Sequence, residues 1–137
     1  HRHRLDWEAA ERRSRPGSLE ARIFGWIRTC LARRKEIAAL AQDAPFRVLE
    51  SPSENLLLCL RGEAAASGGA AAAGSAAPAR ILVVANFAPE PRELALPAAG
   101  FGAAGDCRDL LGCPRARLEE GLLRLGPYGV AWLAPRA

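Results

Sequence analysis

The chain of 137 residues is half hydrophobic and carries a formal net charge of +4, which suits one domain of ordinary size and one further element. No run of eighteen apolar residues is present, so we expect no membrane-spanning helix and no membrane partner. The excess charge lies in residues 1–43, where ten Arg or Lys stand against six Asp or Glu. Because these basic residues flank apolar helical positions, as on a solvated helix face, we expect no nucleic-acid partner.

Cysteine and histidine are too widely spaced for a metal site. The two histidines, His1 and His3, have no third ligand nearby, and no C-x-x-C pair is formed by the four cysteines, which are Cys30, Cys59, Cys107 and Cys113. We therefore expect no metal and no other cofactor. Cys30 and Cys59 stand among apolar residues and are interpreted as small buried hydrophobes.

The sequence contains no methionine and opens on His1, which we interpret as a piece of a longer or processed protein. A basic start followed by an apolar stretch would indicate a secretory signal. The sequence has no such start, and a cytoplasmic location is favoured.

Residues 18–40 have the periodicity of an amphipathic helix. Ser18 is a typical N-cap, and Glu20 lies in the first turn, where the helix dipole favours an acid. Apolar residues then recur at spacings near three and four and predict one stripe. They are Leu19, Ile23, Ile27, Cys30, Leu31 and Ile37, widened by Phe24 and Trp26. We expect the helix to end before Pro45.

A shorter helical turn is predicted at residues 6–13, where Asp6 would open it. Trp7 is expected to pack beneath the start of the long helix, with sugar stacking as a second interpretation.

Short apolar segments separated by Gly and Pro follow, which is typical of an antiparallel sandwich. The predicted strands are Phe46–Glu50, Leu56–Leu60, Ile81–Phe87, Glu93–Leu96, Leu122–Leu125 and Tyr128–Leu133. Trp132 is expected to face the core or a seam with a neighbouring body. Residues 63–79 are almost all Ala, Gly and Ser, and predict a disordered insertion.

The sequence thus predicts an α+β chain in which residues 1–43 end in a helix and residues 44–137 form an antiparallel β-sandwich. A sandwich of this size cannot cover the whole helix stripe without giving up its own core. We therefore expect the helix at residues 18–40 to pack against a larger body that the sequence does not contain.

Four segments, in a fixed order, resemble the amylosucrases of the α-amylase superfamily (glycoside hydrolase family 13). HRHRLDWEAAERRSRPGSLEARIF, residues 1–24, is similar to the family's HRPxMDW stretch, ERR turn and last-helix cap, and IRTCLARRKEIAAL continues that helix. ILVVANFAPEPREL, residues 81–94, and GPYGVAWLAP, residues 126–135, resemble two strands of the C-terminal β domain.

The resemblance implies a (β/α)8 barrel whose last helix lies in residues 1–43, followed by the sandwich of residues 44–137. It implies retaining glucosyl transfer from sucrose to an α-1,4-glucan through a covalent glucosyl-enzyme. Sucrose and α-glucan would then be partners of the longer enzyme. The three catalytic carboxylates would lie upstream of His1, so that this chain has no catalytic residue, is inactive alone and serves a structural role.

The resemblance also implies that Arg2 and Arg4 reach the mouth of the active site, where a guanidinium suits a carboxylate and sugar hydroxyls. The alternative is that both are solvated arginines at a chain end. His3 replaces the family's usual proline, which leaves the shape of this loop open. Asp6, Glu8 and the pair Glu119-Glu120 are interpreted as surface acids, because retaining chemistry needs two carboxyls about 5–5.5 Å apart across a pocket.

Two other interpretations stay open. One is a different enzyme of the same superfamily, such as a sucrose hydrolase, a trehalose synthase or an α-amylase. The other is a non-catalytic, carbohydrate-associated β module, which would need a row of exposed aromatic residues on one sheet.

Overall fold

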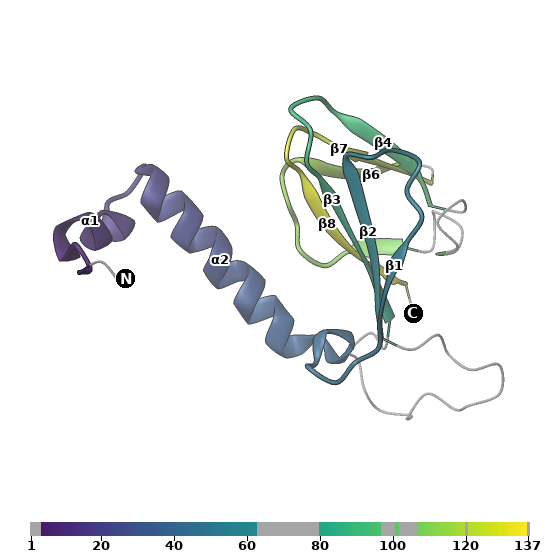
Figure 1. Cartoon of the computed structure of the whole chain (residues 1–137), viewed down its shortest axis with the longest axis horizontal. Coiled ribbons are helices and arrows are strands. Elements are labelled where there is room, and N and C mark those ends of the chain that lie inside the picture. Colours follow the sequence, from purple (N-terminus) through teal and green to yellow (C-terminus); the bar gives the residue numbers. More distant parts are fainter. Residues whose placement is uncertain (1–3, 63–79, 97–100, 102–106, 120, 137) are drawn as a thin grey trace. The chain divides into compact units, whose positions relative to one another are not determined.

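The computed structural model describes the chain apart from residues 1–3, 63–79, 97–100, 102–106, 120 and 137. It divides into two compact units, His1–Arg33 and Arg34–Ala137. Figure 1 shows the helices of the first unit and the two stacked sheets of the second. The predicted insertion at residues 63–79 lies outside the described residues.

The first unit begins with α1, Trp7–Glu11, and the short 3-10 helix η1, Arg12–Ser14. Asp6 caps α1, as predicted, because its Oδ1 accepts a hydrogen bond of 3.0 Å from the Ala9 N–H. Trp7 does not pack beneath a helix: its side chain is 68% exposed, and that prediction is wrong. α1 is only five residues long, and none of its residues is buried.

The long helix α2 spans Leu19–Glu36. Ser18 is its N-cap, as predicted: its Oγ accepts a bond of 3.0 Å from the Ala21 N–H. Glu20 pairs with Arg12 at 3.0 Å between exposed side chains, which ties the first turn of α2 to η1. No helix among the described residues is long and apolar enough to cross a membrane.

The helix ends earlier than its periodicity predicts. Ile37 has an extended backbone, with φ −109° and ψ 106°, and a second 3-10 helix, η2, follows at Ala38–Leu40. Ile37 is buried, in one cluster with Ala39, Ile81 and Ala134 of the second unit. Placing Ile37 on the helix stripe was therefore wrong, because its side chain belongs to the sandwich.

The second unit is an antiparallel sandwich of two sheets. The strands are β1 Phe46–Leu49, β2 Leu56–Gly62, β3 Arg80–Asn86, β4 Arg92–Ala95, β5 Cys107–Asp109, β6 Ala116–Glu119, β7 Leu122–Leu125 and β8 Val130–Pro135. One sheet has the order β1-β2-β3-β8-β5 and the other β4-β7-β6. All described strand pairs are antiparallel, which confirms the antiparallel β-sandwich predicted for the later part of the chain.

The main core lies between the two sheets. It takes alternate residues from each strand, as a half-buried pleated strand requires. Its members include Leu58, Leu82, Leu94, Leu123 and Leu133. Burying each such leucine stabilises the fold by roughly 1.5–3 kcal/mol.

Two strands were not predicted, and one begins later than predicted. β5 and β6 are short segments rich in charge, CRD and ARLE, so they lack an apolar run. Glu119, interpreted from the sequence as a surface acid, is exposed and lies in β6. β8 begins at Val130 rather than Tyr128, because Tyr128 has a left-handed backbone with φ 53° and belongs to the preceding turn.

Candidate functional site

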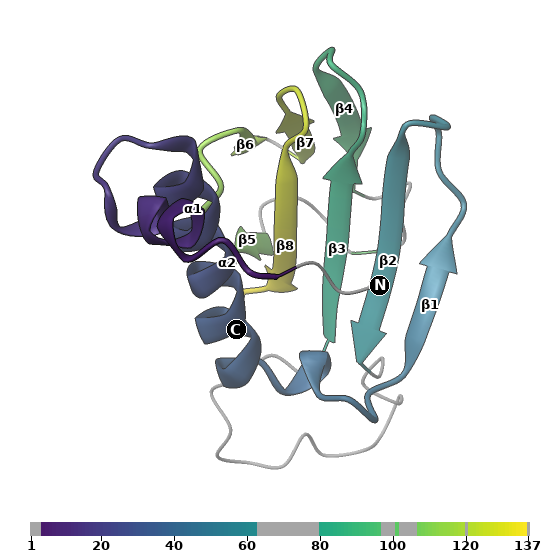
Figure 2. The ribbon, with the colours of Figure 1, turned by 60° about the vertical axis from the view of Figure 1, so that its left-hand side comes forward.

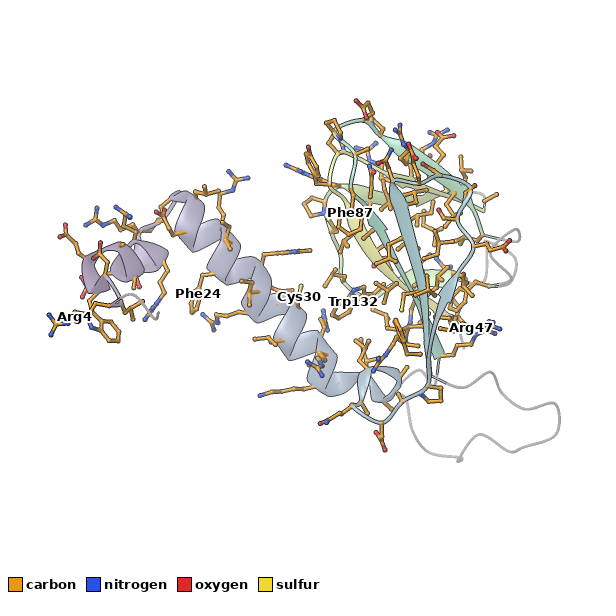
Figure 3. All side chains as sticks on the ribbon, viewed as in Figure 1. Arg4, Phe24, Cys30, Arg47, Phe87 and Trp132 are labelled. Atoms are coloured by element: carbon orange, nitrogen blue, oxygen red, sulfur yellow. The ribbon has the colours of Figure 1, made fainter. Side chains whose placement is uncertain are left out.

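Of the two predicted substrate arginines, the structure describes only Arg4. Arg2 lies outside the described residues. Arg4 lies just before α1 and is exposed (Figure 3). Their proposed roles at an active-site mouth depend on a body that this chain does not contain, and both stay predictions.

The acids near the start of the chain serve the helices. Asp6 is occupied as the cap of α1, and Glu8 is an exposed residue of its first turn. Among the described residues, no group of three His, Cys, Asp or Glu side chains is placed to hold a metal ion.

The most conspicuous surface of the first unit is an apolar side of α2, which we call the helix stripe. Four of its members are aliphatic side chains that are at least half exposed, namely Leu19, Ile23, Ile27 and Leu31. Trp26 and the half-buried Cys30 lie within the same stripe by helical spacing. No residue of α2 is buried.

Phe24 lies beside the stripe, and two arginine side chains contact its ring. The Arg13 guanidinium lies 5.5 Å from the centre of the Phe24 ring and that of Arg28 lies 5.9 Å from it. These distances are within the range of a cation–π interaction. Figure 3 shows Phe24 and Cys30 at different positions around the helix.

A polar junction closes one end of the sandwich and joins the two segments that carry the resemblance to the family's β domain. Asn86 is the buried polar residue at its centre, 3% exposed. Its Nδ2 donates to the carbonyl oxygens of Glu90 at 2.8 Å and Gly126 at 3.0 Å, and its Oδ1 accepts from the Ala88 N–H at 2.9 Å. The Asn86 backbone N–H also donates to the Gly129 carbonyl at 2.9 Å. The asparagine of the ANF segment is thus a structural residue that fixes two turns.

Asp109 has a similar role beside β5. Its Oδ1 accepts bonds from the N–H groups of Leu111 at 3.1 Å and Trp132 at 3.0 Å, and its Oδ2 accepts one from Gly112 at 3.0 Å. Sequence reasoning missed both Asn86 and Asp109 as structural centres. The signal was an isolated polar residue within or just after an apolar segment, a position where a polar side chain needs partners.

Trp132 and Cys59 are the remaining residues whose burial was predicted from the sequence. Trp132 is half-buried with Ile37 on the side of the five-stranded sheet that faces away from the main core, so the core alternative was wrong. Cys59 is buried, as predicted. Burial raises the pKa of the Cys59 thiol, and the nearby Arg61 guanidinium opposes this effect.

Comparison with known proteins found likenesses to parts of two enzymes. A family model of the C-terminal immunoglobulin-like domain of D-apionate lactonase matches residues 67–133, just under half of the chain. A solved structure of the α-glucosyl transfer enzyme XgtA is similar over 83% of this chain, with a TM-score of 0.57 and 23% identity. The chain spans only 18% of that enzyme. No curated protein matches the sequence. These likenesses, with the observed topology, show an antiparallel β-sandwich similar to immunoglobulin-like C-terminal domains.

Proposed function

We propose that this chain is the C-terminal part of a carbohydrate-active enzyme that transfers α-glucosyl units. The observation that carries the proposal is the exposed helix stripe of α2, since a long helix is stable in water mainly when its apolar side packs against a partner. The similar XgtA structure is that of an α-glucosyl transfer enzyme more than five times as long as the matched region, which supports a large partner body.

In this proposal α2 is the last helix of a (β/α)8 barrel, and Leu19, Ile23, Ile27 and Leu31 pack against the barrel wall. The sandwich follows as an accessory domain. The full enzyme is amylosucrase-like and belongs to glycoside hydrolase family 13, as the four sequence segments suggest. The chain itself serves a structural role and is inactive alone.

The chemistry belongs to the missing body. A carboxylate there attacks the glucosyl carbon of sucrose, and a carboxylic acid protonates the departing fructose oxygen. The covalent glucosyl-enzyme then passes its sugar to a glucan hydroxyl, which gives up its proton to the same acid/base residue. Arg2 and Arg4 would reach the pocket entrance from the start of this chain, where a planar guanidinium can pair with an acid of another loop.

A second candidate follows from the family model, which describes the C-terminal domain of a lactonase. The longer enzyme would then hydrolyse a sugar lactone instead of transferring a glucosyl unit. In both candidates the sandwich is a C-terminal domain beside a catalytic body, so the activity of the longer enzyme separates them.

The test uses the longer protein, encoded in the same reading frame upstream of His1, and the 137-residue chain beside it. We expect the longer protein to release fructose from sucrose and to extend maltooligosaccharides, and the chain alone to do neither. Turnover by the chain alone would refute its structural role. Hydrolysis of a sugar lactone without fructose release would select the second candidate.

A substitution at Ile27 tests the proposed role of the helix stripe. Ile27→Lys places a charge at the proposed barrel seam, where the burial of an isoleucine is worth roughly 1.5–3 kcal/mol and a buried cation adds a further penalty. We expect this variant to lose most of the soluble, active longer enzyme. Ala32→Lys, on the opposite, exposed face of α2, is the matched control and should keep its activity. Equal activity of the two variants would refute the docking of α2.

A further inference from the structure

Two large aromatic side chains are exposed at one end of the five-stranded sheet. Phe87 directly follows β3 and is 63% exposed, and Tyr128 lies just before β8 and is 61% exposed. Neither ring belongs to a hydrophobic cluster of the described residues. Packing within the sandwich therefore does not explain why aromatic residues occupy these two positions.

The strand pairing brings the two positions together. The registers of β2 with β3 and of β3 with β8, continued beyond the strands, place Asn55, Phe87 and Tyr128 in one row. Two backbone bonds agree with this placement: the Phe87 N–H donates to the Asn55 carbonyl at 2.8 Å, and the Tyr128 N–H donates to the Ala88 carbonyl at 3.2 Å. Cross-strand neighbours are close enough for one ligand to touch both. We call Asn55, Phe87 and Tyr128 the aromatic row.

Tyr128 has a backbone conformation that a tyrosine rarely adopts. Its φ of 53° lies in the left-handed region, which favours glycine. The Gly129 N–H donates to the Gly126 carbonyl at 2.9 Å and closes the turn around Tyr128. A glycine at position 128 would form this turn with less strain, and the exposed tyrosine ring adds no burial in return. Strained residues of this kind are concentrated at sites that contact a ligand.

The turns that carry the two rings are fixed to one another by the polar junction. Asn86 donates from Nδ2 to the Glu90 carbonyl at 2.8 Å and to the Gly126 carbonyl at 3.0 Å. The first bond closes the turn that follows Phe87, and the second reaches the turn that contains Tyr128. Both rings therefore stand on a preorganised backbone, which lowers the entropy lost when a ligand binds.

Hydrogen-bonding groups lie beside the rings. Arg115 donates from Nη1 to the Pro127 carbonyl at 2.8 Å, which holds its guanidinium next to the turn of Tyr128. A guanidinium has five N–H donors, and this bond uses one of them. The Asn55 amide can both donate and accept. Flat rings with such groups at their edges suit a neutral sugar, whose C–H face stacks on a ring while its hydroxyls form hydrogen bonds.

Figure 2 shows where the aromatic row lies in the sandwich. The β1–β2, β3–β4 and β7–β8 connections gather at one end of the five-stranded sheet, and η2 lies at the opposite end. Ile37, through which the chain enters the sandwich, is buried at that opposite end with Ile81 and Ala134. The aromatic row thus lies at the end of the sheet that is remote from the entry of the chain.

We propose that the aromatic row is a binding site for a neutral α-glucan, with Arg115 as a further donor to its hydroxyls. One glucosyl ring stacks on Phe87 and a neighbouring one on Tyr128, while Asn55 and Arg115 bond their hydroxyls. The choice of an α-glucan rests on the proposed function, in which a growing glucan is the acceptor. A glucan held here would raise the local concentration of acceptor for the catalytic body of the same enzyme.

Titration of the isotope-labelled 137-residue chain with maltoheptaose, followed by nuclear magnetic resonance, tests the assignment without requiring activity. We expect saturable shifts of the amide signals of Phe87, Tyr128 and Gly129. Phe87→Ala and Tyr128→Gly should each weaken the affinity about tenfold, as expected for the loss of one stacking contact. The matched control is Phe46→Ala, which should leave the affinity unchanged. Phe46 is 60% exposed, but it begins β1, and its ring lies 5.8 Å from the Arg61 guanidinium.

The stability of Tyr128→Gly separates a binding role from a structural one. Because glycine adopts a φ of 53° without strain, this variant should not lower the urea midpoint of the chain, although it weakens binding. A lower midpoint with unchanged affinity would assign Tyr128 to the fold and overturn the proposal. Absent shifts, shifts confined to other residues, or shifts that follow protein concentration without sugar would also overturn it.

The longer enzyme supplies the last comparison. Phe87→Cys should react with N-ethylmaleimide at the same rate in the longer enzyme as in the 137-residue chain, and maltoheptaose should slow the reaction in both. Protection in the longer enzyme without sugar would assign Phe87 to a contact with the catalytic body and overturn the proposal. Binding by the chain without glucosyl transfer by the longer enzyme would keep the site and reject the proposed function. Transfer without binding by the chain would reject the site alone.

Discussion

Replacing Asn86 by alanine should be the most damaging single polar substitution in the sandwich. The side chain makes three hydrogen bonds, to the backbone of Glu90, Gly126 and Ala88, at 2.8, 3.0 and 2.9 Å. A neutral hydrogen bond contributes about 0.5–1.5 kcal/mol net, and a buried group that loses its partner costs about 1–3 kcal/mol. We therefore expect Asn86→Ala to lower the free energy of unfolding by about 2–4 kcal/mol, a large share of the 5–15 kcal/mol typical of a domain.

Urea unfolding of the 137-residue chain, followed by circular dichroism, measures this loss. The matched control is Asn55→Ala, because the recorded bonds of Asn55 use its backbone, whose carbonyl accepts from the Phe87 N–H at 2.8 Å. The control should change the unfolding free energy by less than about 0.5 kcal/mol. Equal losses in the two variants, or a loss below about 1 kcal/mol for Asn86→Ala, would show that the junction does not hold the turns together.

Gly129→Ala should lower the free energy of unfolding by about 1–3 kcal/mol, because the new Cβ would lie 3.0 Å from the backbone oxygens of Arg115 and Gly126. The thermal midpoint should fall accordingly. Scanning calorimetry measures the shift, and an unchanged midpoint would refute the close packing of this turn. Ser18→Ala should cost the start of α2 about 1 kcal/mol through loss of its N-cap, seen as reduced protection of the first helical amides in hydrogen exchange. The pKa of Cys59 is raised above 9.0 by burial, so the neutral thiol favours the folded state: this stabilisation is complete below pH 9.0 and is lost as the pH rises through the folded pKa. Cys59→Val should accordingly lose less stability than the native chain as the pH rises above 9.0, and parallel pH profiles would contradict this.

The strand positions were predictable where burial imposes an apolar run. Leu56–Leu60 lies in β2, Ile81–Phe87 lies in β3 except for Phe87, and Leu122–Leu125 is β7 itself, because these strands supply the core. β5 and β6 were not predictable in the same way. They form because their neighbours β8 and β7 offer free backbone partners, which no local pattern records.

The helices show a different limit. Asp6 and Ser18 were predicted as caps because capping is a local interaction. Ile37 fits the helical spacing, but its side chain is taken by a tertiary cluster with Ile81, and the helix ends before it. The prediction that Trp7 packs beneath the helix was wrong for a related reason. Burial depends on the neighbouring parts of the fold, which the spacing of residues does not specify.

The candidate site could be predicted only in part. The apolar stripe on α2 was predicted from the periodicity of the sequence. Because its side chains are exposed, it is a candidate docking surface. The roles of Arg2 and Arg4 depend on groups outside this chain, so that neither the sequence nor the structure alone determines them. The continuous runs LLLCL and ILVVA already indicated that β2 and β3 are apolar on both sides.

The order of strands also has a consequence for biosynthesis. β8, Val130–Pro135, is the last strand in chain order, yet it lies inside the five-stranded sheet between β3 and β5. The sheet cannot be completed until β8 has left the ribosome. Until then the inward-facing leucines of β2 and β3 lack Leu133 as a packing partner. Such long-range closure folds slowly compared with local pairing. Translation must therefore pass Pro135 before the sandwich becomes stable, and chaperones would meet the unfinished sheet during that interval.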